Sequence, residues 1–148
     1  MLYTGIACAM LGATFVCPLP AFAALGQTVG SIDTDASQLK ATAHSATQQS
    51  GYTVHLLTLP TGGTVREFVS AGGVVFGVAW QGPTLPDLKT LLGASFEPYV
   101  AATATRTAIP GVSTDDLVVE SGGHLRAFAG HAYLPKSVPS GVDTGAIQ

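Results

Sequence analysis

Runs of β-branched and aromatic residues separated by glycine pairs constrain the fold of this chain more than any other feature. Three such runs occupy residues 52–59, 64–70 and 74–81, and the short sequences PTGG and AGG connect them. β-Branched and aromatic residues favour strands, and glycine adopts the positive φ of tight turns at little steric cost. Two short connections between successive strands predict a three-stranded antiparallel meander.

A C-terminal hairpin is predicted by two further strand-like runs that flank the sequence SGG. The runs occupy residues 116–120 and 124–134. A three-residue SGG loop places Val119 opposite Leu125 on an apolar face, and Glu120 opposite His124 on the other face. A two-residue loop would mix charged and apolar side chains on both faces, so we expect the three-residue loop.

Apolar residues at helical spacing predict a helix before the meander. Within residues 31–48, Ile32, Ala36 and Leu39 recur at intervals of three and four, and alanines continue the stripe. The stripe is narrow and its residues are mostly small. We therefore expect a weakly amphipathic helix that lies on a sheet.

Two more helices are predicted between the meander and the hairpin. In residues 84–93, Thr84 is placed to cap the helix, leucines form an apolar stripe and a glycine ends it. A further helix is predicted at residues 96–105, followed by a loop at 108–114. The tail from Pro135 onward is rich in proline and glycine and is expected to be a surface segment that packs only locally.

The order of these elements predicts an α+β fold. The antiparallel sheet has about five strands, a three-strand meander plus a C-terminal hairpin, with helices packed on one face. The sequence contains no internal repeat, and we expect a single domain at residues 24–148 with an irregular C-terminal tail.

The first 23 residues have the pattern of a cleavable signal peptide. An apolar run at residues 6–16 is followed by two prolines and by Ala21-Phe22-Ala23, the small-x-small pattern that precedes cleavage. A transmembrane anchor is the competing interpretation, but the apolar run is shorter than the ~20 residues of a spanning helix. We expect cleavage after Ala23, a mature chain without a transmembrane segment, and a periplasmic or secreted protein.

Composition excludes several classes of function. Both cysteines, Cys8 and Cys17, leave with the signal peptide, so the mature chain has no disulfide, thiol nucleophile or cysteine zinc site. The net charge is −3 without a basic cluster, which argues against nucleic-acid binding. Charged residues make up only 10% of the chain, where roughly 25% is usual, so the few charged clusters merit attention.

Seven segments of the chain are distinctive: GYTVH (51–55), TVREFVS (64–70), GVVFGVAWQGP (73–83), LPDL (85–88), LLG (91–93), DDLVVESGGH (115–124) and RAF (126–128). Together they resemble a family of exported proteobacterial proteins that is catalogued only as domain of unknown function 2844. The similarity extends from Ala24 to about Val142. It implies an exported bacterial protein and assigns no catalytic or ligand-binding residue.

A serine, a histidine and acidic residues lie close together near the SGG sequence. Ser121, His124 and Glu120, with Asp115 and Asp116, suggest a hydrolase triad. No Gly-x-Ser-x-Gly elbow is present, and a serine before two glycines is typical of a turn. We therefore predict no catalytic residue.

The four histidines do not predict a metal site. His124 and His131 are an odd number of residues apart, so they face opposite sides of a regular strand. His44 is expected on a helix and His55 on a separate strand. Zinc sites require three or four converging ligands, so neither a metal nor another cofactor is predicted.

One polar cluster on the sheet is the candidate ligand-binding site. Its predicted members are Arg66, Glu67, Trp80, Glu120, His124 and Arg126. Surface ion pairs are the simpler interpretation of the charged members, and core packing is the simpler role for Trp80.

We expect a non-enzymatic binding or interaction module of the periplasm or cell envelope, with a protein or envelope component as its partner. The partner would bind the sheet face or an exposed edge strand. The alternative is a small hydrolase-like envelope enzyme that uses Glu120, His124 and Arg126. A concave site that collects these three side chains would favour the enzyme.

Overall fold

The computed structural model of the protein describes residues 25–104 and 111–148. The predicted signal peptide at residues 1–23 and the first part of the loop predicted at 108–114 lie outside the described residues. Within the described part of the chain, no helix is long and apolar enough to cross a bilayer.

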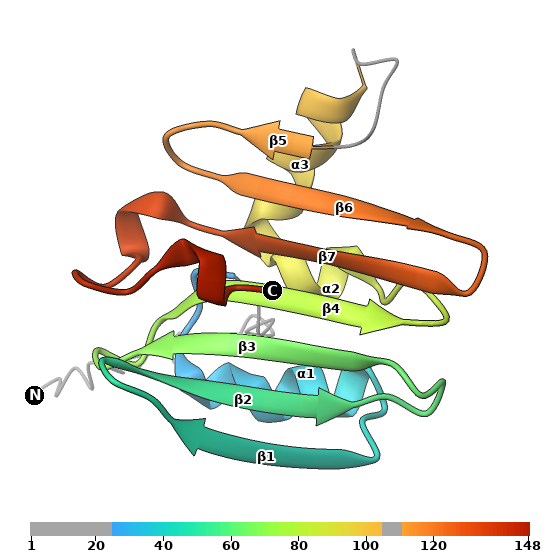
Figure 1. Ribbon diagram of the computed structural model, residues 1–148, viewed down its shortest axis with the longest axis horizontal. Coiled ribbons are helices and arrows are strands. Elements are labelled where there is room, and N and C mark those ends of the chain that lie inside the picture. Colours follow the sequence, from blue (N-terminus) through green and yellow to red (C-terminus); the bar gives the residue numbers. More distant parts are fainter. Residues whose placement is uncertain (1–24, 105–110) are drawn as a thin grey trace, which may run out of the picture.

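The described residues form an α+β structure around one antiparallel sheet of seven strands, in the order β1-β2-β3-β4-β7-β6-β5 (Figure 1). The strands are β1 (Ala43–Gln48), β2 (Tyr52–Thr58), β3 (Thr64–Ser70), β4 (Val75–Gly82), β5 (Gly111–Ser113), β6 (Val118–His124) and β7 (Ala127–Tyr133). The helices are α1 (Ile32–Gln38), α2 (Leu88–Leu92) and α3 (Phe96–Thr103), with short 3-10 turns η1 (Val29–Ser31), η2 (Gly93–Ser95), η3 (Pro135–Ser137) and η4 (Thr144–Ala146).

The predicted meander and hairpin form the centre of this sheet, and the expected number of about five strands is wrong because both edge strands were missed. The meander is β2, β3 and β4, and the hairpin is β6 and β7, which pairs antiparallel with β4. β5 is only three residues long and lies within the segment predicted to be a loop. β1 lies within the segment predicted to be the first helix.

The first helix ends much earlier than expected. α1 stops at Gln38, and Lys40 adopts a positive φ of 54°. The N–H of Ala41 donates to the carbonyl of Ala36 (2.8 Å), and the N–H of Lys40 donates to the carbonyl of Ser37 (3.1 Å). These two bonds form a Schellman C-cap, which usually contains glycine at the residue with positive φ. Because lysine occupies that position, the sequence carried no stop signal.

The other two helices lie within the predicted segments, but α2 begins only at Leu88 and so is shorter than expected. Asp87, rather than Thr84, caps α2, because its side chain accepts a hydrogen bond from the N–H of Lys89 (3.0 Å). Leu91 and Leu92 are fully buried, as the predicted leucine stripe requires. α3 begins at Phe96 and covers most of the predicted helix.

Two of the three glycine pairs form turns as predicted. Gly62 and Gly73 have positive φ values of 84° and 78° in the β2–β3 and β3–β4 connections. The third pair is different: Gly122 and Gly123 belong to β6 and pair with Ala129 and Phe128.

The predicted register of the C-terminal hairpin is therefore wrong. Glu120 lies opposite His131, not His124, and Val119 lies opposite Ala132. The hairpin turns at Leu125 and Arg126, which has a φ of 67°. Positive φ is uncommon for a residue other than glycine, so the sequence favoured the glycine pair as the turn.

β4 is buried on both sides, and different parts of the chain cover its two faces. Val78 and Trp80 belong to the larger apolar cluster, which also contains Ile32 of α1 and Leu91 of α2. We call this side the helix face, because Figure 1 shows the three helices behind the sheet. This arrangement agrees with the prediction that helices pack on one face.

The C-terminal segment covers the opposite side, which we call the tail face. Ile147 is fully buried in a second apolar cluster with Phe68, Phe76 and Ala79. A Cβ atom at Gly77 would lie 3.1 Å from a methyl carbon of Ile147, so the absence of a side chain there lets the tail approach the sheet. The expectation that the tail packs only locally is therefore wrong, because burying the apolar tail face of β4 requires a cover.

Replacing Ile147 by alanine should lower the free energy of unfolding by about 2–5 kcal/mol, the usual cost of truncating a buried isoleucine. Urea unfolding followed by circular dichroism measures the change. Thr144→Ala, an exposed position in η4, serves as the control. Equal stability of the two variants would contradict the assignment of the tail to the core.

Candidate functional site

A row of polar side chains crosses the tail face of the sheet. Arg66 pairs with Ala79, Ala79 with His131, and His131 with Glu120, so the four residues lie side by side on β3, β4, β7 and β6. Residues that oppose one another in an antiparallel sheet share a face. Ala79 lies between Arg66 and His131 in this row and is itself buried in the cluster that contains Ile147.

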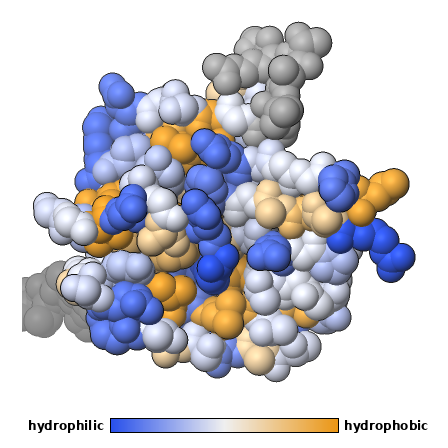
Figure 2. Space-filling view, in the orientation of Figure 1, coloured by the Kyte–Doolittle hydropathy of each residue, from blue (hydrophilic) through white to orange (hydrophobic). Residues whose placement is uncertain are grey.

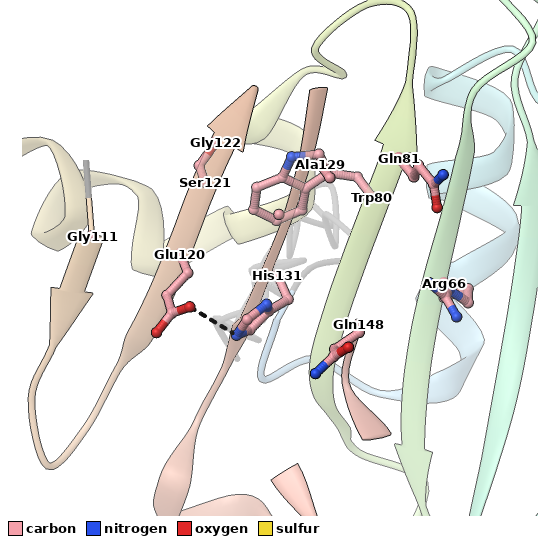
Figure 3. A pocket seen from close by; sticks show the side chains of 11 residues that line it. Arg66, Trp80, Gln81, Gly111, Glu120, Ser121, Gly122, Ala129, His131 and Gln148 are labelled. Carbon is pink, nitrogen blue, oxygen red and sulfur yellow. Dashed lines mark ion pairs between the residues drawn. The ribbon is translucent and has the colours of Figure 1, made fainter. Parts of the chain in front are cut away.

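The row borders a hollow of about 880 Å³, which we call the central hollow (Figure 3). It is lined by Arg66, Trp80, Gln81, Gly111, Glu120, Ser121, Gly122, Ala129, Gly130, His131 and Gln148. Gly122 and Ala129 lie opposite each other and provide little side-chain volume. A Cβ atom added at Gly122 would meet nothing within 4 Å. The glycine predicted to make a turn therefore leaves open space on the face of the sheet.

A second hollow of about 380 Å³ adjoins the first on the side of β1 and β2. Arg66 lines both hollows, and the C-terminal segment contributes Ala146 to one and Gln148 to the other. Figure 2 shows hydrophilic residues gathered in a band through the middle of this face, with hydrophobic residues on either side. Arg66 thus lies where the two hollows of the tail face meet.

Glu120 and His131 form the ion pair of this site. Glu120 Oε2 lies 3.9 Å from His131 Nε2, and Figure 3 shows the two side chains facing each other. The Glu120 side chain is 70% exposed and that of His131 is 21% exposed, so the pair contributes little to stability. The His131 ring stacks on Tyr133, with centroids 6.2 Å apart, which limits the directions in which the imidazole points.

Trp80 borders the central hollow, but almost all of its side chain is buried in the core. It is 2% exposed and packs in the apolar cluster of the helix face. A Cβ atom at Gly130 would lie 2.4 Å from its ring, so glycine at this position lets the ring pack against β7. Within the described residues, its buried Nε1 has no hydrogen-bond partner. The simpler interpretation of Trp80 as a packing residue holds.

His124 and Arg126 do not join the predicted cluster. Both lie at the tip of the β6–β7 hairpin, and Leu125 between them is 92% exposed. Four strand positions separate Glu120 from His124, a distance of about 13 Å at ~3.3 Å per residue. The central hollow therefore does not collect the three side chains that the alternative enzyme requires.

Glu67 points to the helix face, away from Arg66, and is 1% exposed. Its neighbour is Asp35 of α1, which is also 1% exposed. Burial raises the pKa of both carboxyl groups, and for Asp35 the adjacent Glu67 raises it further. Within the described residues, neither Asp35 carboxylate oxygen has a hydrogen-bond partner. This pair is a buried contact between α1 and β3 and lies on the opposite face of the sheet from the central hollow.

Of the charged residues predicted to form the polar cluster, Arg66 and Glu120 both line the central hollow. It missed the contributions of Gln81, His131 and Gln148, which line the central hollow. If the pairing of β4 with β7 had been known, the alternation of side chains along each strand would have placed Gln81 and His131 on the same face. No local signal could bring Gln148 to the sheet, because the packing of Ile147, with Val138 and Val142, against distant strands holds the tail there.

The fold and the site define a class of α+β proteins in which an antiparallel sheet carries helices on one face and a polar hollow on the other. The family model described as "Protein of unknown function (DUF2844)" matches residues 21–147, and the chain belongs to this family. No curated protein and no solved structure matches the chain.

Because the folded state raises the pKa of Asp35 and Glu67 above their ordinary values of 3.8 and 4.5, it binds more protons than the unfolded state. This contribution to stability is complete below about pH 4 and is lost as the pH rises through the raised pKa values. Glu67→Gln should therefore raise the free energy of unfolding by about 1 kcal/mol or more at pH 8, and much less at pH 4.5.

Urea unfolding at the two pH values checks this prediction. Glu97→Gln, at an exposed position on α3, is the matched control and should show no such difference. A Glu67→Gln effect of the same size at both pH values would contradict the raised pKa.

Proposed function

We propose that this protein is an exported, non-enzymatic binding module of the periplasm or cell envelope, and that it binds a peptide segment of a partner protein on its tail face. The observation that carries this proposal is the central hollow, in which Arg66, Gln81, Glu120, His131 and Gln148 surround a floor of small residues. Charged residues are scarce in this chain, so their presence around one hollow favours recognition of a polar ligand.

The lining combines hydrogen-bond donors and acceptors, as a peptide ligand requires. Arg66 and the amide groups of Gln81 and Gln148 provide donors, and Glu120 provides an acceptor. Within the described residues, Arg66 forms no ion pair. Its guanidinium is therefore available to an acidic side chain of the ligand, which it would bind in a bidentate manner.

The two adjoining hollows favour an extended ligand over a compact one. Arg66 lies between them, with the larger hollow over β7 and β6 and the smaller one over β1 and β2. A peptide that passes Arg66 would contact both. An enzyme is less well supported, because the acid, base and cation predicted for it lie apart.

Site-specific photo-crosslinking tests the binding surface. A crosslinking amino acid at the exposed Gln81 should capture an envelope protein in cells, whereas the same group at Lys89, exposed on α2, should not. Arg66→Ala should reduce capture at residue 81 roughly tenfold, because a hydrogen bond to a charged group contributes about 1.5–3 kcal/mol.

Gly122→Phe provides an independent variant for the same experiment. A side chain at this position meets no neighbour at Cβ, so it should fill the hollow without straining the sheet. Capture should fall while the unfolding transition stays unchanged. Undiminished capture by both Arg66→Ala and Gly122→Phe would refute the proposed surface.

Export is tested separately. The protein recovered from the periplasm or the medium should begin at Ala24, as the small-x-small pattern before this residue predicts. Intact-mass measurement of the recovered protein determines its N-terminus. A cytoplasmic protein that retains residues 1–23 would contradict the predicted signal peptide and its export.

A further inference from the structure

Two histidines that were predicted to lie on separate elements, a helix and a strand, lie together on the helix face. His44 is on β1, not on a helix, and His55 is on β2. Their partners in the register, Leu57 and Ala46, show that the two histidines are diagonal neighbours on one face. Diagonal neighbours of an antiparallel pair are within reach of long side chains.

The imidazole rings are in direct contact. His44 Nε2 lies 3.0 Å from His55 Nδ1, the ring centroids are 5.3 Å apart, and the rings are tilted by 33°. One nitrogen donates a proton to the other in this arrangement. Both rings remain accessible, since β1 is exposed along its whole length and His55 is only partly buried.

The distance between these nitrogens is close to that of two ligands of one metal ion. With Zn–N bonds of about 2.0–2.1 Å, two nitrogens of a tetrahedral site are about 3.3 Å apart. Small rotations of both rings would widen the contact by a few tenths of an ångström and turn both lone pairs toward a common point. The ion would replace the proton that the two rings share.

We propose that His44 and His55 form a binding site for a first-row divalent cation of the Zn²⁺ or Cu²⁺ class, with His44 Nε2 and His55 Nδ1 as its ligands. Neutral imidazole is a preferred ligand of both ions. The site lies on the opposite face of the sheet from the central hollow and does not depend on the proposed peptide binding.

Asp33 of α1 supports this site as a positioning residue. Its Oδ1 lies 4.0 Å from His44 Nδ1, the ring nitrogen that faces away from His55. A carboxylate beside the second nitrogen of a metal-binding histidine fixes the ring orientation and increases the basicity of the ligand. The Asp33 side chain is 91% exposed, so its effect is smaller than that of a buried carboxylate.

The described residues supply two ligands and no complete cage, because no group of three or more His, Cys, Asp or Glu side chains within them is placed to hold an ion. Water would fill the remaining positions of the metal. Such a site binds less tightly than a structural zinc site and leaves positions open for exchange.

Calorimetric titration with ZnCl₂, and separately with CuSO₄, tests the proposal on the tag-free full chain. Cys8 and Cys17 are replaced by serine so that their thiolates do not compete. We expect one ion per chain, with tighter binding of copper than of zinc. His44→Ala and His55→Ala should each weaken binding at least roughly tenfold, and Asp33→Asn should weaken it less.

His124→Ala and His131→Ala are matched controls that remove an imidazole elsewhere and should leave affinity unchanged. The ¹⁵N shifts of His44 Nε2 and His55 Nδ1 should move on zinc addition. Should His55→Ala unfold, the exposed His44→Ala variant and these shifts still decide the question. Absence of binding to the unsubstituted histidines, or affinity unchanged in His44→Ala, overturns the proposal.

Discussion

The burial of β4 on both faces is the constraint on which the rest of the structure depends. Val78 and Trp80 face the helices, whereas Phe76 and Ala79 face the tail, and each is at most 2% exposed. A strand with apolar side chains on both sides needs two covers, because either bare face would leave hydrophobic surface in water. The three helices provide one cover. The C-terminal segment provides the other, and its contact with β4 brings Ile147 into the core.

Both polar sites lie where these covers stop. On the tail face, the C-terminal segment protects the aromatic cluster but leaves Arg66, His131 and Glu120 beside a hollow. On the helix face, α1 buries Glu67 against Asp35, while His44 and His55 lie toward the exposed strand β1. Asp35 and Glu67 are thus paired in the core, whereas Arg66, His131 and Glu120 lie beside the C-terminal segment on the tail face.

Elements fixed by contacts between near neighbours in the chain were predictable from the sequence, and elements fixed by distant contacts were not. The meander was predictable because Gly62 and Gly73 supply a positive φ that the adjoining turns require, whatever lies elsewhere in the protein. The predicted register of the hairpin was wrong because Arg126 adopts the positive φ of the turn without being glycine. The pairing of β6 with β5 and β7 outweighs the local cost of this conformation. The end of α1 was not predictable either, because Lys40 also adopts a positive φ where glycine is usual.

The sequence by itself determined the antiparallel α+β class, the central strands and the leucines that α2 buries, because these follow from residue spacing and turn chemistry over a few residues. Only the tertiary structure decided which side chains meet. Side chains alternate between the two faces of a strand. Whether Arg66 or Glu67 is buried therefore depends on which face of the sheet the helices cover and which face the C-terminal segment covers. Likewise, His44 contacts His55 because β1 pairs with β2. This pairing depends on hydrogen bonds between two segments, whereas a helix at the same residues would need hydrogen bonds within one segment.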